Sequence, residues 1–134
     1  MVITNKAQLL VEIILSLPEG WAKKFGDKLS KDIWSILEEK DLVGKYNLLQ
    51  VKEKFGMLRW YGRPAVPEIK DIIKKYTHVS KYTCYSCGDS AQWVLTNPWI
   101  IPICECCKNT KAKKDEAELS IDYWKNWEEL TKGE

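Results

Sequence analysis

Two short stretches decide the fold of this chain, KYTCYSCGDS at residues 81–90 and IPICECCKN at residues 101–109. They hold all five cysteines, four of which follow the pattern Cys84-x2-Cys87, sixteen intervening residues, then Cys104-x2-Cys107. A two-residue gap lets one tight turn direct two sulfurs at a common point, and two such turns supply four thiolates in a tetrahedron around zinc. The pattern predicts a zinc ribbon with one structural Zn2+ ion.

The fifth cysteine, Cys106, is adjacent to Cys107 and cannot easily share one metal ion with it. One interpretation is a small, buried or half-buried spare residue. The other is a reactive thiol, helped by the neighbouring Lys108 and opposed by Glu105, because a nearby positive charge lowers a thiol pKa and a negative charge raises it.

The residues before the ribbon predict two helical regions. Residues 5–16 have apolar side chains at helical spacing, and Asn5 with Gln8 resembles a capping box. Pro18 and Gly20 end this helix, and a second helical region follows to about Lys40, with a possible break at Gly26.

A hairpin and a third helix come next. The stretch YNLLQVKEKFGMLRWYG, residues 46–62, predicts a β-hairpin whose turn lies in KEKFG. Pro67 suits the first position of a helix in which Ile69, Ile72, Ile73 and Tyr76 form an apolar stripe.

The remaining elements flank the second cysteine pair. AQWVL and WIIPI, residues 91–95 and 99–103, predict short strands around the turn TNPW. A terminal helix is indicated by the spacing of Leu119, Tyr123, Trp127 and Leu130. The predicted class is α+β, with three to four helices, a short β-hairpin and a four-cysteine zinc ribbon. The regions are 1–80, 81–112 and 113–134, forming one compact unit.

Composition and charge limit the classes of function. The formal net charge of the 134 residues is +2, and binding of zinc by four thiolates brings it to about zero, so strong whole-molecule attraction to nucleic acid is not implied. The apolar run LLVEIILSL is interrupted by Glu12 and lacks a cleavage site, which indicates a cytoplasmic protein without a membrane span. Cysteines in that compartment stay reduced, which favours metal binding over disulfides.

The sequence also argues against an enzyme. His78 is the only histidine and has no local signature of a Ser-His or Cys-His pair. No glycine-rich phosphate-binding motif is present. A zinc ion with four cysteine ligands has no position for an activated water, so we expect no catalytic residues.

The hairpin offers the strongest candidate for a binding surface. VKEKFGMLRWYGRP, residues 51–64, includes both arginines of the chain. Strand alternation separates Leu58 and Trp60 from Arg59 and Tyr61. This surface suits either an acidic protein or a nucleic-acid backbone, whereas the simpler interpretation is a solvated outer face. The candidate partner-binding residues are Lys52, Lys54, Arg59, Tyr61 and Arg63.

Four motifs give the chain a resemblance to a known family. GWAKKFG, YNLLQVKEKFGMLRWYG, CYSCG and PWIIPICECC resemble those of small bacterial and phage proteins with a K-E-K-[FY]-G-x-L-R-[FWY]-Y box and a zinc ribbon. The likeness covers roughly residues 20–107 in order, although Pro98 replaces the glycine usual before the ribbon tryptophan. Most members have no assigned activity, so the resemblance implies architecture and a phage context.

The expected function follows from that context and from the lack of catalytic residues. Small phage proteins of this kind often block a host machine, and the chain resembles zinc-bearing anti-CRISPR inhibitors of Cas9. We expect a non-enzymatic protein that binds Cas9 or another host nuclease stoichiometrically in the bacterial cytoplasm. The alternative is a nucleic-acid-binding zinc-ribbon accessory protein in phage transcription or replication, and an enzyme that uses Cys106 is a third class.

Overall fold

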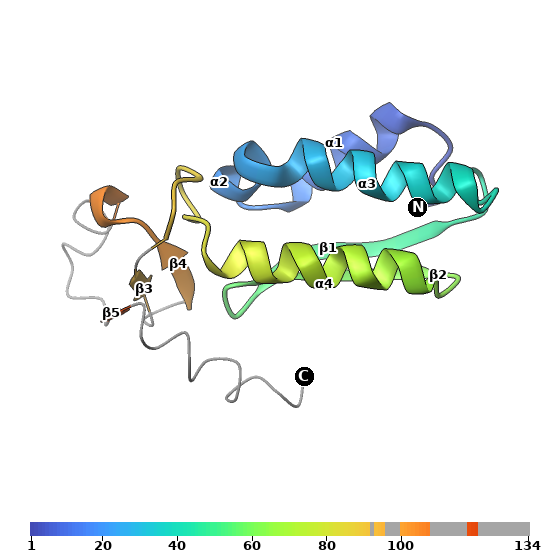
Figure 1. Cartoon of the computed structure of the whole chain (residues 1–134). Coiled ribbons are helices and arrows are strands. Elements are labelled where there is room, and N and C mark those ends of the chain that lie inside the picture. The colour runs from blue at the N-terminus through green and yellow to red at the C-terminus, as the bar shows by residue number, and fades with distance from the viewer. Residues whose placement is uncertain (92, 96–99, 108–117, 121–134) are drawn as a thin grey trace.

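The computed structural model describes residues 1–91, 93–95, 100–107 and 118–120. Helices lie on one face of a two-stranded hairpin, and a small ribbon lies at one end of this body (Figure 1). The α+β class predicted from the sequence is confirmed. No helix in the described ranges has the length and apolar content that a bilayer span requires.

The N-terminal helices begin and end where the sequence predicts. Helix α1 spans Lys6–Ser16, and the Asn5 side chain accepts a hydrogen bond of 2.9 Å from the backbone N–H of Gln8, which caps the helix. A continuous helical segment follows, made of α2 (Glu19–Trp21), a wide π turn (η1, Ala22–Gly26) and α3 (Asp27–Glu39). Gly26 does not break it, since its φ of −55° and ψ of −44° are helical.

The predicted hairpin consists of β1 (Asn47–Lys54) and β2 (Met57–Arg63), paired antiparallel. Its two-residue turn is left-handed at both positions, with φ of +54° at Phe55 and +78° at Gly56. The Glu53 carboxylate accepts the backbone N–H of Gly56 at 2.9 Å and closes the turn. The KEKFG motif therefore supplies the turn chemistry of the hairpin.

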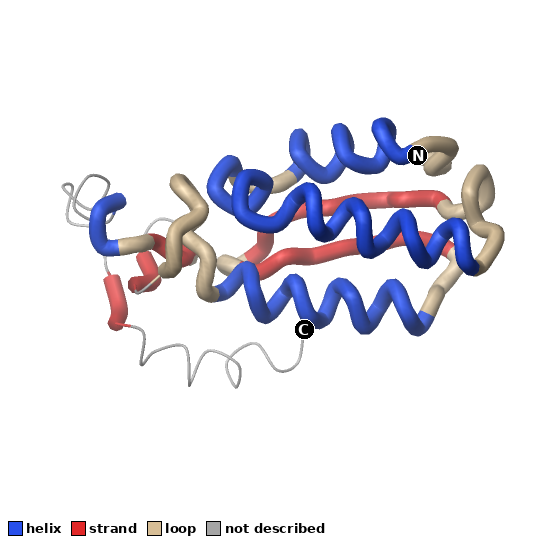
Figure 2. Tube along the Cα trace, turned by 45° about the horizontal axis from the view of Figure 1, so that its top comes forward, coloured by secondary structure: helices blue, strands red, loops and turns tan. Residues whose placement is uncertain are grey.

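Helix α4 (Pro67–Lys81) lies beside β2, and its side chains bond to the strand backbone. The backbone N–H of Leu58 donates to the Ser80 hydroxyl at 3.0 Å, and the Thr77 hydroxyl donates to the carbonyl of Leu58 at 3.2 Å. Figure 2 shows α3 lying between α1 and α4 on the same side of the hairpin. The apolar sides of these elements form one core that includes Leu9, Ile13, Trp21, Phe25, Leu29, Ile33, Leu37, Leu48, Val51, Leu58, Ile69 and Tyr76.

The ribbon contains β3 (Trp93–Leu95), β4 (Ile101–Ile103) and β5 (Glu118–Ser120), in the order β4-β3-β5. The two strands predicted on either side of TNPW are confirmed, whereas that turn lies outside the described residues. Residues 118–120 are a strand and not part of a helix, because their backbone pairs with β3. The rest of the predicted helix at 113–134 lies outside the described residues and stays a prediction.

The ribbon is attached to the body by a close approach of two backbones. The backbone N–H of Gly20 donates to the carbonyl of Tyr85 at 2.9 Å, and the Trp21 indole donates to the carbonyl of Thr83 at 3.0 Å. A Cβ on Gly20 would lie 2.2 Å from the Cys84 carbonyl oxygen and 2.6 Å from the Gly88 nitrogen. Only glycine fits at position 20.

Replacing Gly20 by alanine tests this attachment, with Gly26→Ala as the matched control in the same helical segment. We expect Gly20→Ala to lower the free energy of unfolding by about 1–3 kcal/mol, as overpacking does. Gly26→Ala should be neutral or stabilising by up to about 1 kcal/mol, because its Cβ meets only ordinary contacts of 3.7 Å and alanine favours helix. Urea denaturation measures both, and equal effects of the two changes would contradict the assignment.

Candidate metal centre

The four predicted ligands come from two turns that face each other across the ribbon. Cys84 and Cys87 lie in the turn that follows α4, and Gly88 completes this turn with a φ of +85°. Cys104 and Cys107 lie at the end of β4 and in the short helical turn after it. The backbone N–H of Tyr85 donates to the carbonyl of Pro102 at 2.9 Å, which holds the first turn against β4.

The sulfur atoms of Cys84, Cys87, Cys104 and Cys107 all lie within 4.8 Å of one another. The sulfur atoms of Cys87 and Cys104 are 3.5 Å apart. Four sulfurs at the zinc–sulfur distance of about 2.3 Å in a tetrahedron would be about 3.8 Å apart. Two of the thiols are buried and two are half-buried, so the cluster can enclose a metal ion of this size.

The electrostatics of the cluster call for a cation. Burial raises the pKa of Cys84, but hydrogen bonds from the backbone N–H groups of Cys87, Cys104 and Ser86 outweigh it and bring the pKa to about 7. A backbone hydrogen bond from Asp89 lowers the pKa of Cys87, but burial and hydrogen bonds with the thiols of Cys104 and Cys84 together outweigh it and raise the pKa to about 11. Burial and neighbouring thiols also raise the pKa of Cys107. Four thiolates can therefore coexist here only with a metal ion to balance their charge.

Cys106 does not belong to the cluster. It is exposed, whereas the four clustered thiols are buried or half-buried. The neighbouring Glu105 carboxylate accepts a hydrogen bond from the Trp93 indole N–H, which ties the second turn to β3. The spacing argument that set Cys106 apart from the ligands agrees with this geometry, whereas the interpretation of Cys106 as a buried or half-buried residue is wrong, since its side chain is exposed.

The five candidate partner-binding residues come together on one face of the hairpin, which we call the outer face. Lys52 lies opposite Arg59, and its ammonium group is 6.0 Å from the centre of the Tyr61 ring. Lys54 and Arg63 lie at alternate positions on the same strands and are exposed. The outer face, defined as Lys52, Lys54, Arg59, Tyr61 and Arg63, thus places four positive charges and one aromatic ring on the same side of the hairpin.

The opposite side of the hairpin is committed to the core. Leu58 and Trp60 pack against the helices, as strand alternation predicts. Arg59 is half-buried and its Nε atom is buried, whereas Lys54, Tyr61 and Arg63 are exposed. Phe55, which is not one of the five candidate residues, is 42% exposed in the left-handed turn, with the Lys54 ammonium 5.4 Å from its ring.

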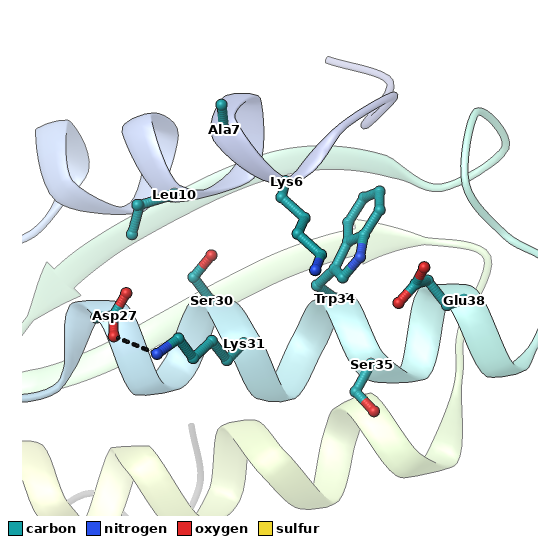
Figure 3. A pocket seen from close by; sticks show the side chains of 9 residues that line it. All are labelled: Lys6, Ala7, Leu10, Asp27, Ser30, Lys31, Trp34, Ser35 and Glu38. Carbon is teal, nitrogen blue, oxygen red and sulfur yellow. Dashed lines mark ion pairs between the residues drawn. The ribbon is translucent and has the colours of Figure 1, made fainter.

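A hollow of about 520 Å³ lies between α1 and α3 (Figure 3). Two lysines and two acidic residues line it, and Lys31 pairs with Asp27 at 3.0 Å. Lys6 and Glu38 also line it, so opposite charges are balanced there. This hollow offers a charged partner much less attraction than the outer face.

Comparisons of the chain with protein-family models, curated proteins and solved structures give no match. The function is therefore argued from the metal centre and the outer face.

Two neighbouring cysteines provide a matched test of the metal centre. We expect Cys107→Ser to reduce bound metal and to lower the unfolding temperature, because it removes one of four ligands. Cys106→Ser should leave one metal ion per chain. Elemental analysis of the purified variants measures both, and a loss of metal from Cys106→Ser with retention in Cys107→Ser would reverse the assignment.

Proposed function

We propose that this chain is a non-enzymatic zinc protein that acts by binding another protein in a fixed ratio through the outer face of its hairpin. The observation that carries the proposal is the gathering of Lys52, Lys54, Arg59, Tyr61 and Arg63 on one face, with no acidic side chain among them. None of the five belongs to the hydrophobic core of the body. These five side chains are therefore available to contact a partner.

Zinc is the metal we assign to the cysteine cluster. Four thiolates in a tetrahedral arrangement are a common ligand set of structural zinc, and they leave no position for a water molecule. The ion then cross-links the two turns of the ribbon. This assignment is the reason for proposing a binding protein and not a zinc hydrolase.

The chemistry of the outer face favours a protein partner with an acidic surface. Arginine and tyrosine are the residue types that most often dominate the binding energy of protein interfaces. The two strands and the α4 side chains that bond to β2 hold these side chains on a backbone with little freedom, which reduces the entropy lost on binding. An acidic partner would be steered toward this face by its charge.

For the target we propose a host nuclease of bacterial defence, with Cas9 as the leading candidate. This step rests on the resemblance to small phage proteins and to zinc-bearing anti-CRISPR inhibitors. Such an inhibitor needs no catalytic activity, because covering a surface of the nuclease is sufficient to inhibit it. The proposed place of action is the cytoplasm of the bacterial host.

A second candidate is binding to single-stranded nucleic acid. The observation that favours it is the exposure of two rings, Phe55 and Tyr61, each within about 6 Å of a lysine ammonium group. Aromatic rings beside cations form stacking platforms for bases next to contacts for phosphates. This candidate gives the outer face a different ligand and leaves the role of the metal unchanged.

Charge reversal on the outer face tests the proposal. A tagged chain is used to capture proteins from bacterial lysate, and the bound proteins are identified by mass spectrometry. We expect one dominant protein with the unchanged chain and at least a tenfold loss with Lys52→Glu/Lys54→Glu, because two attractive charge pairs become repulsive. Lys28→Glu/Lys74→Glu, an equal charge change on α3 and α4, should capture as much as the unchanged chain.

Nuclease treatment and salt separate the two candidates. A protein partner should survive nuclease, whereas capture through nucleic acid should disappear and should weaken steeply with salt in proportion to the phosphates contacted. Undiminished capture by Lys52→Glu/Lys54→Glu would remove the outer face from both candidates.

A further inference from the structure

The two edges of the hairpin differ in what binds to their backbone. On β2, the N–H of Leu58 donates to the Ser80 hydroxyl and its carbonyl accepts the Thr77 hydroxyl, so both groups point away from β1. In an antiparallel pair, two directly opposite residues direct these groups either toward each other or away from each other. Glu53 lies opposite Leu58, and its backbone N–H and carbonyl therefore point away from β2.

The same alternation applies to Val51, two residues before Glu53, whose backbone groups point to the same side of β1. In the part of the chain that the structure describes, no hydrogen bond occupies these groups of Val51 and Glu53. We call this pair of residues the free edge. Lys52 and Lys54 of the outer face alternate with them along the strand, so an open backbone and two positive side chains lie together.

The start of β1 shows that this side of the strand accepts another strand. Val2 forms an antiparallel bridge with Asn47. The Leu48 N–H donates to the Met1 carbonyl at 2.8 Å, and the Met1 amino group donates to the Leu48 carbonyl at 3.1 Å. The N-terminal residues thus cover β1 only as far as Leu48. The free edge begins beyond the register shift that follows this residue.

We propose that an extended segment of the protein partner adds to β1 as a third strand, bonding to Val51 and Glu53 and placing acidic side chains opposite Lys52 and Lys54. The proposal rests on the proposed function and states which kind of partner segment meets the outer face. Open backbone donors and acceptors along an edge select an extended chain, which presents complementary groups at the same spacing. The segment runs antiparallel to β1, as residues 1–3 do.

Charge decides which extended segment fits. Directly opposite residues of antiparallel strands share one face of the sheet, so the side chains opposite Lys52 and Lys54 lie on the outer face. Arg59 lies opposite Lys52 on β2 and adds a third positive charge there. A second copy of the chain fits poorly, because the symmetric register that pairs Val51 with Glu53 of the other copy places the two Lys52 side chains opposite each other, and like charges there are destabilising.

The test uses the full chain with its metal and the acetylated, amidated peptide ETEVT. In the antiparallel register its glutamates lie opposite Lys52 and Lys54, and its valine and first threonine lie opposite Val51 and Glu53. Two further peptides of this sequence carry backbone N-methyl groups. One is methylated on the valine and first threonine, whose N–H groups face β1, and the other on the two glutamates, whose N–H groups face away. These two peptides have the same composition and charge.

Amide hydrogen exchange, followed by two-dimensional NMR, is the readout because it reports backbone hydrogen bonds. In the chain alone, we expect the amides of Val51 and Glu53 to exchange about tenfold faster, or more, than that of Lys52, which bonds to β2. Saturating ETEVT, or the peptide methylated on its glutamates, should slow exchange at Val51 and Glu53 about three- to tenfold. The peptide methylated on its valine and threonine should leave this exchange unchanged.

A charge exchange tests the side-chain part of the proposal. The peptide KTKVT should slow exchange at Val51 and Glu53 in the Lys52→Glu/Lys54→Glu variant and have no effect on the unchanged chain. ETEVT should show the reverse preference. Circular dichroism and metal content confirm that the variant is folded.

The outcomes separate this inference from the proposed function. Slow exchange at Val51 and Glu53 without peptide would show that a second copy or another part of the chain occupies the free edge, and overturns the inference. No effect of ETEVT, or equal effects of the two methylated peptides, overturns it even if Lys52→Glu/Lys54→Glu abolishes protein capture. An effect of the glutamate-methylated peptide alone supports it even if that variant captures as much protein as the unchanged chain.

Discussion

The contact between Gly20 and the first cysteine turn is the constraint on which the rest of the structure depends. Here the backbone of a helix lies against the backbone of a metal-binding turn, with room for no side chain between them. The hydrogen bonds of Gly20 and Trp21 to Tyr85 and Thr83 fix the position of the turn. The metal ligands are thus placed by the helical body as well as by the ribbon.

A second set of contacts connects the ribbon to the hairpin. Met57, the first residue of β2, packs with Val94 of the ribbon, and a Cβ on Gly56 would lie 3.3 Å from the carbonyl oxygen of Ile100. The tip of the hairpin therefore rests on the domain that the metal organises. The outer face and the metal centre are separate sites with a shared support.

The extent to which the sequence predicts this structure differs from one feature to the next. Helical spacing, Asn5 and Pro67 predicted the helices because these signals are local, and two C-x2-C pairs predicted the cluster because metal geometry demands that spacing. The contacts of Gly20 with Gly88 and of Gly62 with Tyr46 could not be predicted, because each joins residues far apart in the chain. The sequence assigned Gly20 only to the end of the first helix and Gly62 only to the hairpin stretch, whereas the atoms that each glycine approaches show why no side chain fits there. Residues 118–120 formed a strand because pairing with β3 overrides local helical spacing.

The hydrogen bonds that join the side chains of Ser80 and Thr77 to the backbone of Leu58 affect how the hairpin can pair with another chain. A two-stranded hairpin ordinarily has two open edges, and a molecule with two such edges can grow into a continuous stack. Here α4 occupies the β2 edge at Leu58, while Met1 occupies the start of β1 through its bonds to Leu48. At these positions another strand could pair with the hairpin only if these hydrogen bonds were broken first. Each edge of the hairpin is therefore protected over part of its length against pairing with another chain.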